Sequence, residues 1–220
     1  MQNRINVLIV ENESLIVDIL KKAFSSLNTE NSNFNLNVAD SCDESVMEIE
    51  RQSSIDLALI NINIPPCRGS KVLFAEDISI KLRAKFPSTK IILFSSYKSN
   101  IKINSLLKTM NPDCLLVKSD ITFDELIKAI ETVIIEPPYY SKTVMSYLRR
   151  YITQDIVIDK VDKLILYYLS IGTRTKDLPG LVHLSLGAVE LRKRKLKDVF
   201  CIDKGDDSRL LEHARAQGFV

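Results

Sequence analysis

The sequence is poor in the residues that build metal clusters and disulfide frameworks. It has no tryptophan, two histidines and four cysteines in 220 residues. No two cysteines form a CxxC pair, so this spacing favours separate, buried thiols in a reducing compartment over a zinc site. No apolar run is long enough to cross a bilayer, and the N-terminus lacks a signal-peptide pattern. We therefore expect a soluble, cytoplasmic protein without membrane contact. The four cysteines are Cys42, Cys67, Cys114 and Cys201.

The sequence also lacks a strong overall charge, with a formal net charge of only +2. The charges are nevertheless distributed unevenly. Acidic residues gather early, at positions 11–18 and 43–50, and a basic run follows late, at positions 192–197. This asymmetry indicates a C-terminal part that faces nucleic acid.

Short apolar runs alternate with amphipathic segments over the first 135 residues. The apolar runs predict buried strands and the segments of helical periodicity predict helices. This alternation is typical of an α/β fold, a doubly wound five-stranded parallel sheet of the flavodoxin-like type, in which function gathers at the carboxyl ends of the strands. Strands are expected at 5–10, 34–38, 56–61, 90–95 and 113–118, and helices at 13–27, 43–51, 70–86, 101–110 and 122–134.

The pattern changes after the Pro137-Pro138 pair, which ends the last of these helices. A connecting helix is expected at 141–151, and no strand pattern follows it. Helices are expected at 159–171, 175–183, 186–199 and 207–217. The sequence thus predicts an α/β domain over 1–135, a linker over 136–157 and an all-α domain over 158–220.

Four short motifs occur in a fixed order in the first part: VLIVEN, DLALININIPP, LFSS and LLVKSD. In this order and spacing they resemble the receiver domain of bacterial response regulators, over about the first 135 residues. The resemblance implies a phosphoacceptor position, an acidic pair, a hydroxyl, a lysine and a switch position. Here these are Asn61, Glu11 with Asn12, Ser95, Lys118 and Leu115.

The residues at these positions depart from working receiver chemistry. An amide at Asn61 cannot form the acyl phosphate that a carboxylate nucleophile forms. With Asn12 in the acidic pair, one carboxylate remains where the family offers three, so Mg²⁺ binding should be weak or absent. We expect a pseudo-receiver. The alternative, an isolated substitution that mimics the unphosphorylated state, accounts less well for Asn12 and Leu115. Ser95 and Lys118 could also serve only structural hydrogen bonds, with Glu11 as the partner of Lys118.

The last part resembles the four-helix DNA-binding domain of the NarL/LuxR family, over about residues 158–220. A scaffold helix ends at Gly172, Thr175 caps the next short helix, and Ser185 is the N-cap of the helix expected to enter the major groove. Leu178, Leu181, Leu186, Val189 and Leu196 are expected to point inward, and Glu190, Arg192, Lys193, Arg194 and Lys197 mostly outward.

The resemblance implies DNA contacts near the start of that helix, at Glu190, Leu191 and Arg194. Lys193, Lys195 and Lys197 would neutralise phosphate. Glu190 departs from the basic residue often found there, but a glutamate can accept a hydrogen bond from cytosine N4. Pro179 replaces a usual alanine near the first turn of its helix, where a missing amide costs little.

The sequence supports two functions. The first is a DNA-binding transcription regulator of response-regulator type that is independent of phosphorylation, binds double-stranded DNA and forms a homodimer. The second is an adaptor that docks on a partner regulator, or binds DNA only with such a partner. A basic helix can also be merely a solvated face, but the capped helix-turn-helix frame favours DNA binding. A phosphotransfer enzyme is disfavoured by Asn61, so we expect no catalytic residues, no cofactor and no metal site.

Overall fold

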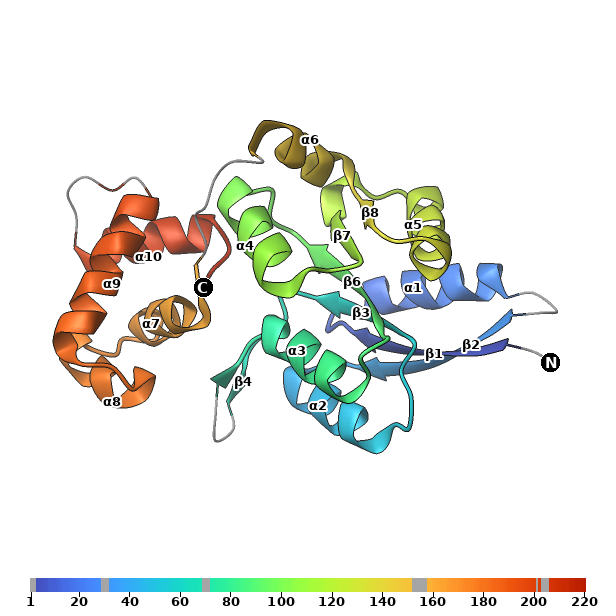
Figure 1. Ribbon diagram of the computed structural model, residues 1–220, viewed down its shortest axis with the longest axis horizontal. Coiled ribbons are helices and arrows are strands. Elements are labelled where there is room, and N and C mark those ends of the chain that lie inside the picture. The colour runs from blue at the N-terminus through green and yellow to red at the C-terminus, as the bar shows by residue number, and fades with distance from the viewer. Residues whose placement is uncertain (1–2, 29–31, 69–71, 152–157, 201, 203–205) are drawn as a thin grey trace. The chain divides into compact units, whose positions relative to one another are not determined.

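The computed structural model describes residues 3–28, 32–68, 72–151, 158–200, 202 and 206–220. The chain divides into two compact units (Figure 1). The first unit comprises residues 1–98 with 110–152, and the second comprises residues 99–109 with 153–220. In the part of the chain that the structure describes, every helix is too short or too polar to cross a membrane.

A parallel sheet forms the centre of the first unit. Its strand order is β2-β1-β3-β6-β7-β8, and all neighbouring strands run parallel. The doubly wound α/β fold is therefore confirmed, with six strands in place of the expected five. The strands are β1 (Asn3–Val10), β2 (Ser32–Ala39), β3 (Leu57–Asn61), β6 (Lys90–Ser95), β7 (Cys114–Val117) and β8 (Tyr139–Tyr140).

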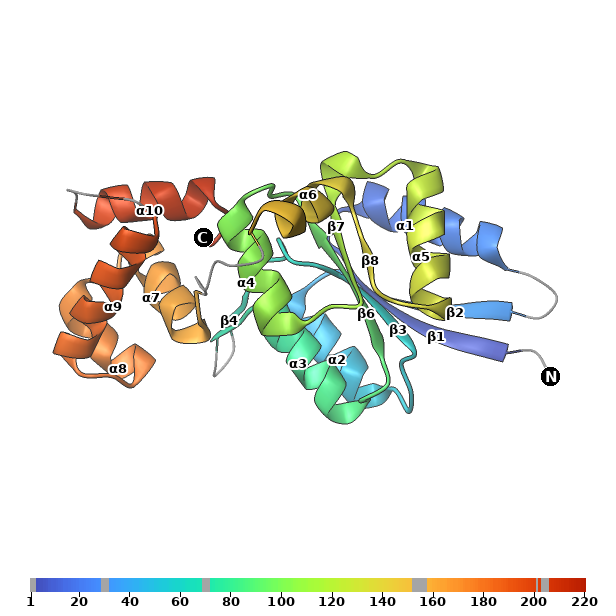
Figure 2. The same cartoon turned by 45° about the horizontal axis from the view of Figure 1, so that its top comes forward.

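Helices cover both faces of this sheet (Figure 2). On one face α1 (Ser14–Leu27) and α5 (Phe123–Ile135) lie side by side, and α2 (Cys42–Arg51) and α3 (Ala75–Lys85) pair on the other. The alternation of side chains along each strand sends one set to each face. One core cluster lies under α1 and α5 and includes Ile9, Phe24, Leu59, Ile92, Leu116 and Ile130.

The segment between β3 and α3 differs from the expectation. A helix was expected from residue 70, but the chain forms a short hairpin of β4 (Cys67–Arg68) and β5 (Val72–Leu73), and α3 begins at Ala75. The Asp77 carboxylate accepts a hydrogen bond from the Phe74 N–H at 2.9 Å, which satisfies a free amide at the start of the helix.

The expectation of separate thiols is wrong for two of the four cysteines. Cys42 and Cys67 form a disulfide with Cα atoms 5.3 Å apart. Sequence spacing could not reveal this pair, because the two cysteines follow strands β2 and β3, and only the parallel sheet brings those strand ends to one edge. Cys114 is buried and free, and Cys201 lies outside the described residues.

The end of the first unit contains two elements that the sequence assigned to a linker. Strand β8 pairs with β7, and α6 (Lys142–Tyr151) follows it. The Asp120 carboxylate, in the short 3-10 helix η1 (Lys118–Asp120), accepts hydrogen bonds from the Ser141 and Thr143 hydroxyls and from the Thr143 N–H, at 2.7–2.9 Å. These bonds fix the start of α6 against the first unit.

The second unit is helical, as expected. Its helices are α7 (Lys160–Ser170), α8 (Leu178–Val182), α9 (Leu186–Val199) and α10 (Asp207–Ala216), with the 3-10 helix η2 (Thr175–Asp177) before α8. Helix α4 (Asn100–Met110) was expected in the α/β domain, but most of it groups with this unit, because Ile101 packs against the core of the unit. Ile165, Leu178, Val189, Leu196 and Leu210 belong to its core.

Three details of the second unit correct the expectations. Leu181 and Leu186, expected to point inward, are 42% and 48% exposed. Thr175 begins η2 and its side chain caps no helix, because its hydroxyl is bonded to Lys193 and Asp207. Pro179 does lie at the start of α8, where it removes no intrahelical hydrogen bond.

Candidate functional site

Two groups of residues were singled out by the sequence, one in each unit. The first lies at the carboxyl edge of the sheet. Asn61 ends β3, and Glu11 and Asn12 follow β1, the neighbouring strand. The Asn61 side-chain amide donates to Glu11 Oε1 at 2.8 Å, and Asn12 Oδ1 lies 3.5 Å from the same nitrogen. Asn61 and Glu11 are almost fully buried, so their hydrogen bond is shielded from water.

Lys118 belongs to the same group. Its ammonium lies 3.2 Å from Glu11 Oε2 and 2.7 Å from Glu13 Oε1. The expectation that Glu11 supplies the partner of Lys118 is confirmed. Glu13 was missed, although this second acid, two residues after Glu11, is visible in the sequence. Both carboxylate oxygens of Glu11 are thus engaged, one by an amide and one by an ammonium.

Ser95 and Leu115 lie on neighbouring strands but take no part in this cluster. The Ser95 hydroxyl donates to the Tyr97 carbonyl at 3.2 Å and accepts from the Tyr97 N–H at 3.1 Å. Ser95 therefore holds the turn after β6. Leu115 is fully buried in β7, so this position is part of the core.

Asn63 is a further member of the group that the sequence did not reveal. Its backbone N–H donates to Asn61 Oδ1 at 2.9 Å, and its side-chain oxygen accepts from the Ser96 N–H at 3.1 Å. Asn63 therefore connects the ends of β3 and β6 through neutral hydrogen bonds. The amide of Asn61 uses its nitrogen as a donor and its oxygen as an acceptor, which a carboxylate could not do.

Receiver domains suggest a Mg²⁺ ion at this edge, but the residues present do not fit one. A hard cation needs several free oxygen ligands. Glu11 is the only buried carboxylate of the group, and both its oxygens are already bonded. No cluster of three or more metal-ligating side chains is found among the described residues. The arrangement is a closed network of hydrogen bonds and ion pairs.

The second group lies on α9. Ser185 is its N-cap, as expected, and the Ser185 hydroxyl accepts from the Ala188 N–H at 3.2 Å. Glu190, Leu191, Arg194 and Lys195 are exposed along the helix. Within the described residues, neither Arg194 nor Lys195 takes part in an ion pair. Two cations and an exposed leucine thus remain available on this face.

Lys193 corrects the expectation of an outward, phosphate-binding side chain. It is 6% exposed, and its ammonium bonds Asp207 Oδ2 at 2.8 Å and Thr175 Oγ1 at 2.7 Å. Residues at spacings of three and four share one helix face, so Lys193 continues the buried stripe of Val189 and Leu196. That spacing could have identified it. Lys193 fastens α9 to the start of α10.

Arg192 likewise points to a neighbouring helix. Its guanidinium lies 2.7 Å from Asp159 and 2.8 Å from Asp162, which together form the capping box of α7. Burial alone would raise the pKa of Asp159, but hydrogen bonds from the Asp162 N–H and Arg192 hold that pKa below its usual value. Burial and the nearby Asp159 charge raise the pKa of Asp162. Arg192 therefore joins α9 to α7.

Lys197 is intermediate in exposure, and its ammonium lies 3.9 Å from Asp207. Of the six positions taken as DNA contacts, four thus lie on the exposed surface of α9, Lys197 lies at its margin, and Lys193 is buried. The four exposed positions are Glu190, Leu191, Arg194 and Lys195.

Comparison with known proteins identifies the fold. No family model matches the sequence. The chain is 24% identical over 198 residues to the transcriptional regulatory protein MctR of Rhizobium johnstonii. The aligned region covers 88% of this chain and 86% of that protein.

Solved structures share this fold at low sequence identity. RcsB of Salmonella enterica serovar Typhimurium, bound to the promoter rprA, superposes with a TM-score of 0.69 and 14% identity over 96% of this chain and 98% of that chain. A structure of two RcsB dimers bound to two parallel DNAs superposes with a TM-score of 0.60 and 13% identity, over 97% of this chain and 99% of that chain. A CheY-like receiver domain from Methanospirillum hungatei superposes with a TM-score of 0.50 and 20% identity, over 61% of this chain and 96% of that chain. The chain therefore has the fold of a NarL/LuxR-type response regulator, a receiver joined to a helical domain.

Proposed function

We propose that this protein is a transcription regulator that binds double-stranded DNA through α9 and needs no phosphorylation to do so. The observation that carries the proposal is the exposed face of α9, where Arg194 and Lys195 have no ion-pair partner among the described residues and Leu191 is 51% exposed. A capped helix with exposed cations suits entry into a major groove flanked by phosphates. The DNA-bound RcsB structures of the same fold support this assignment.

The side chains on this face suggest how a base sequence is read. The Glu190 carboxylate can accept a hydrogen bond from cytosine N4, and Leu191 can contact a thymine methyl group. Arg194 can bond guanine or phosphate, and Lys195 can neutralise phosphate. We therefore expect half-sites that contain cytosine and thymine next to each other.

Phosphorylation independence rests on the closed network at the sheet edge. Asn61 offers no carboxylate, and the Glu11 carboxylate that would help to hold Mg²⁺ is bonded to Asn61 and Lys118. A receiver built this way has one resting arrangement and no acyl phosphate to change it. We propose no catalytic activity for it, and a DNA-binding function places the protein in the cytoplasm.

A homodimer is the form that would read two half-sites. The adjoining helices α1 and α5 carry exposed apolar residues: Leu15 at 70%, Ile19 at 38% and Phe123 at 37%. A hollow of about 410 Å³ lies beside them, lined by Ile16, Leu20, Phe94 and Leu126 among others. We propose this surface as the contact between copies, in keeping with the RcsB dimers of the same fold.

The experiment that tests the function is selection of duplexes from a random-sequence pool by the untreated protein. The expected result is a two-fold symmetric motif, and Arg194→Ala should weaken its binding. Lys176→Ala, at an exposed cation in η2 before α8, is the matched control. Failure to enrich any duplex would favour the adaptor, which binds DNA only with a partner regulator, and repeating the selection with such a partner would then recover a motif.

A further inference from the structure

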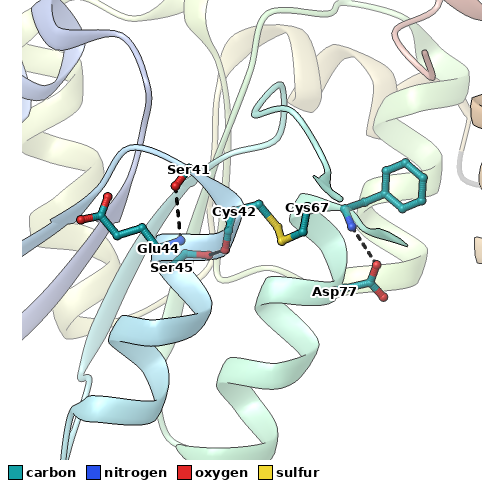
Figure 3. Close-up of a disulfide and its surroundings, with 7 residues drawn as sticks. Ser41, Cys42, Glu44, Ser45, Cys67 and Asp77 are labelled. Atoms are coloured by element: carbon teal, nitrogen blue, oxygen red, sulfur yellow. Dashed lines mark hydrogen bonds between the residues drawn. A yellow bond between two sulfur atoms is a disulfide. The ribbon is translucent and has the colours of Figure 1, made fainter. Parts of the chain in front are cut away.

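The Cys42–Cys67 disulfide joins two segments that leave the same edge of the sheet (Figure 3). Cys42 is the first residue of α2, which follows β2, and Cys67 opens the hairpin that follows β3. Asn61 ends β3 at that edge and lies beside Glu11. The disulfide therefore fastens the segment that follows Asn61 to the start of α2.

The core beneath α1 and α5 is built without this bond, because that cluster of buried side chains contains neither cysteine. Small domains use disulfides when their core is too small to hold the fold. Here the sheet is covered on both faces, so a purely structural role explains the bond poorly.

We propose that Cys42 and Cys67 are a reversible thiol–disulfide site, and that its redox state replaces phosphorylation as the chemical input at this edge of the sheet. This inference rests on the proposed function in one respect. A DNA-binding protein works in a reducing compartment, where disulfides are usually transient, catalytic or redox-sensing.

The reaction is thiol–disulfide exchange with a low-molecular-weight disulfide such as glutathione disulfide. One protein thiolate attacks that disulfide, which releases one thiol and leaves a mixed disulfide on the protein. The second protein thiolate then attacks the protein-bound sulfur, which releases the second thiol and closes the Cys42–Cys67 bond. The two cysteines lose two protons and two electrons, and the oxidant becomes two thiols. Reduction by excess thiol runs the same steps backwards.

Cys42 and Cys67 are 2% and 3% exposed, so an outside thiol reaches the pair only when the segment that carries Cys67 opens. Each strand of the β4–β5 hairpin has two residues, and so small a hairpin is only marginally stable by itself and can open at low cost. Cys42 lies at a helix N-terminus, which favours the thiolate, while the carboxylates of Asp43 and Glu44 in the same turn oppose it. We therefore assign neither cysteine as the first nucleophile.

Cys114 is a built-in control. It is fully buried in β7, in the middle of the sheet, and burial raises the pKa of its thiol far above the usual value. A thiol in this state is unreactive. Among the three cysteines that the structure describes, only the pair at the sheet edge should respond to a change of redox buffer.

The test equilibrates the full chain in glutathione buffers of graded redox ratio, followed by acid quenching, alkylation under denaturing conditions and peptide mapping. We expect the Cys42 and Cys67 peptides to lose alkylation together, reversibly, while Cys114 remains alkylated and the circular dichroism spectrum stays native. Two results would overturn the site: a pair that stays reduced in the most oxidising buffer, or a chain that unfolds when the pair is reduced.

The second measurement compares the affinity of the oxidised and reduced protein for its selected duplex. We expect a difference of about fivefold or more, the usual size of coupling between two sites. Cys42→Ser and Cys67→Ser should each abolish it, and Cys114→Ser should retain it. Equal affinities would overturn the role as a signal. A protein that binds no duplex in either state would contradict the proposed function instead, and the alkylation titration would still decide the thiol site.

Discussion

Individual residues decide whether this chain can act as a phosphorylated receiver. Asn61 is bonded through both atoms of its amide, to Glu11 by its nitrogen and to the Asn63 N–H by its oxygen. Lys118 neutralises Glu11 from the other side at 3.2 Å. The buried charge of Glu11 is thus already neutralised within the chain, without a metal ion or a phosphoryl group.

Restoring a carboxylate at position 61 should therefore destabilise the folded chain. Asn61→Asp removes the bond to Glu11 and brings two carboxylates together, so the free energy of unfolding at pH 7 should fall by about 1–3 kcal/mol. Urea unfolding followed by circular dichroism measures this. Adding Glu11→Gln should recover most of the loss, because it removes the repulsion. An Asn61→Asp variant as stable as the wild type would contradict the closed network.

Two nearby lysines on α9, Lys193 and Lys195, should differ in how much they contribute to the free energy of unfolding. Lys193→Met leaves Asp207 and Thr175 without their buried partner, so the free energy of unfolding should fall by about 1–3 kcal/mol. Lys195→Met, two positions away and exposed, should change it by less than about 0.5 kcal/mol. Urea unfolding of both variants checks this. The reverse ranking would mean that Lys193 is not buried in solution.

At the level of elements, α6 depends on one carboxylate. Burial would raise the pKa of Asp120, but hydrogen bonds from Thr143 and Ser141 together lower it. A lowered pKa in the folded state stabilises the protein above the ordinary carboxyl pKa of about 3.9, and this stabilisation is lost as the pH falls through the folded value.

Asp120→Asn should therefore lower the free energy of unfolding by about 1–2 kcal/mol at pH 7. The difference from the wild type should shrink as the pH falls below about 4, where the wild-type carboxyl becomes protonated. Thermal unfolding of both proteins across this pH range is the measurement. A difference that stays constant with pH would show that the charge of Asp120 does not stabilise α6.

The elements also show how far the sequence alone reaches. Helix α9 was predicted with the observed bounds, because Ser185 provides a cap and the apolar spacing is strong. The hairpin β4–β5 and strand β8 were missed, because two-residue strands have no periodicity to detect. The outward prediction for Lys193 overlooked its spacing with Val189 and Leu196, which places it on the buried face of the helix. Its partner Asp207, on another helix, could not be foreseen. The disulfide could not be foreseen because it depends on the strand order of the sheet.

At the scale of the whole molecule, the proposed function requires two copies of the chain on one operator. Leu15→Asp should weaken self-association by about tenfold or more, because a charge would enter an apolar contact. Met47→Asp, on α2 and 63% exposed, is the matched control and should leave it unchanged. Analytical ultracentrifugation measures the dimer dissociation constant of each variant. Equal weakening by the two variants, or none by Leu15→Asp, would place the contact between copies elsewhere.

Binding to DNA should also depend strongly on salt. Arg194→Ala should cost about 1–3 kcal/mol of binding free energy if Arg194 bonds a base, or reduce the salt slope by about one unit if it contacts phosphate. Titrations of the selected duplex at several salt concentrations, with Glu190→Gln in parallel, separate the two cases. A titration that Arg194→Ala leaves unchanged at every salt concentration would exclude α9 as the DNA-binding helix.

The most direct test of the central claim compares the affinity of the protein for its selected duplex with and without beryllofluoride and Mg²⁺. We expect the two dissociation constants to agree within about twofold, below the usual range of allosteric coupling, because Asn61 and the engaged Glu11 provide no acceptor and no metal site. A gain of about fivefold or more, or a stable phosphoprotein after treatment with acetyl phosphate, would contradict regulation without phosphorylation.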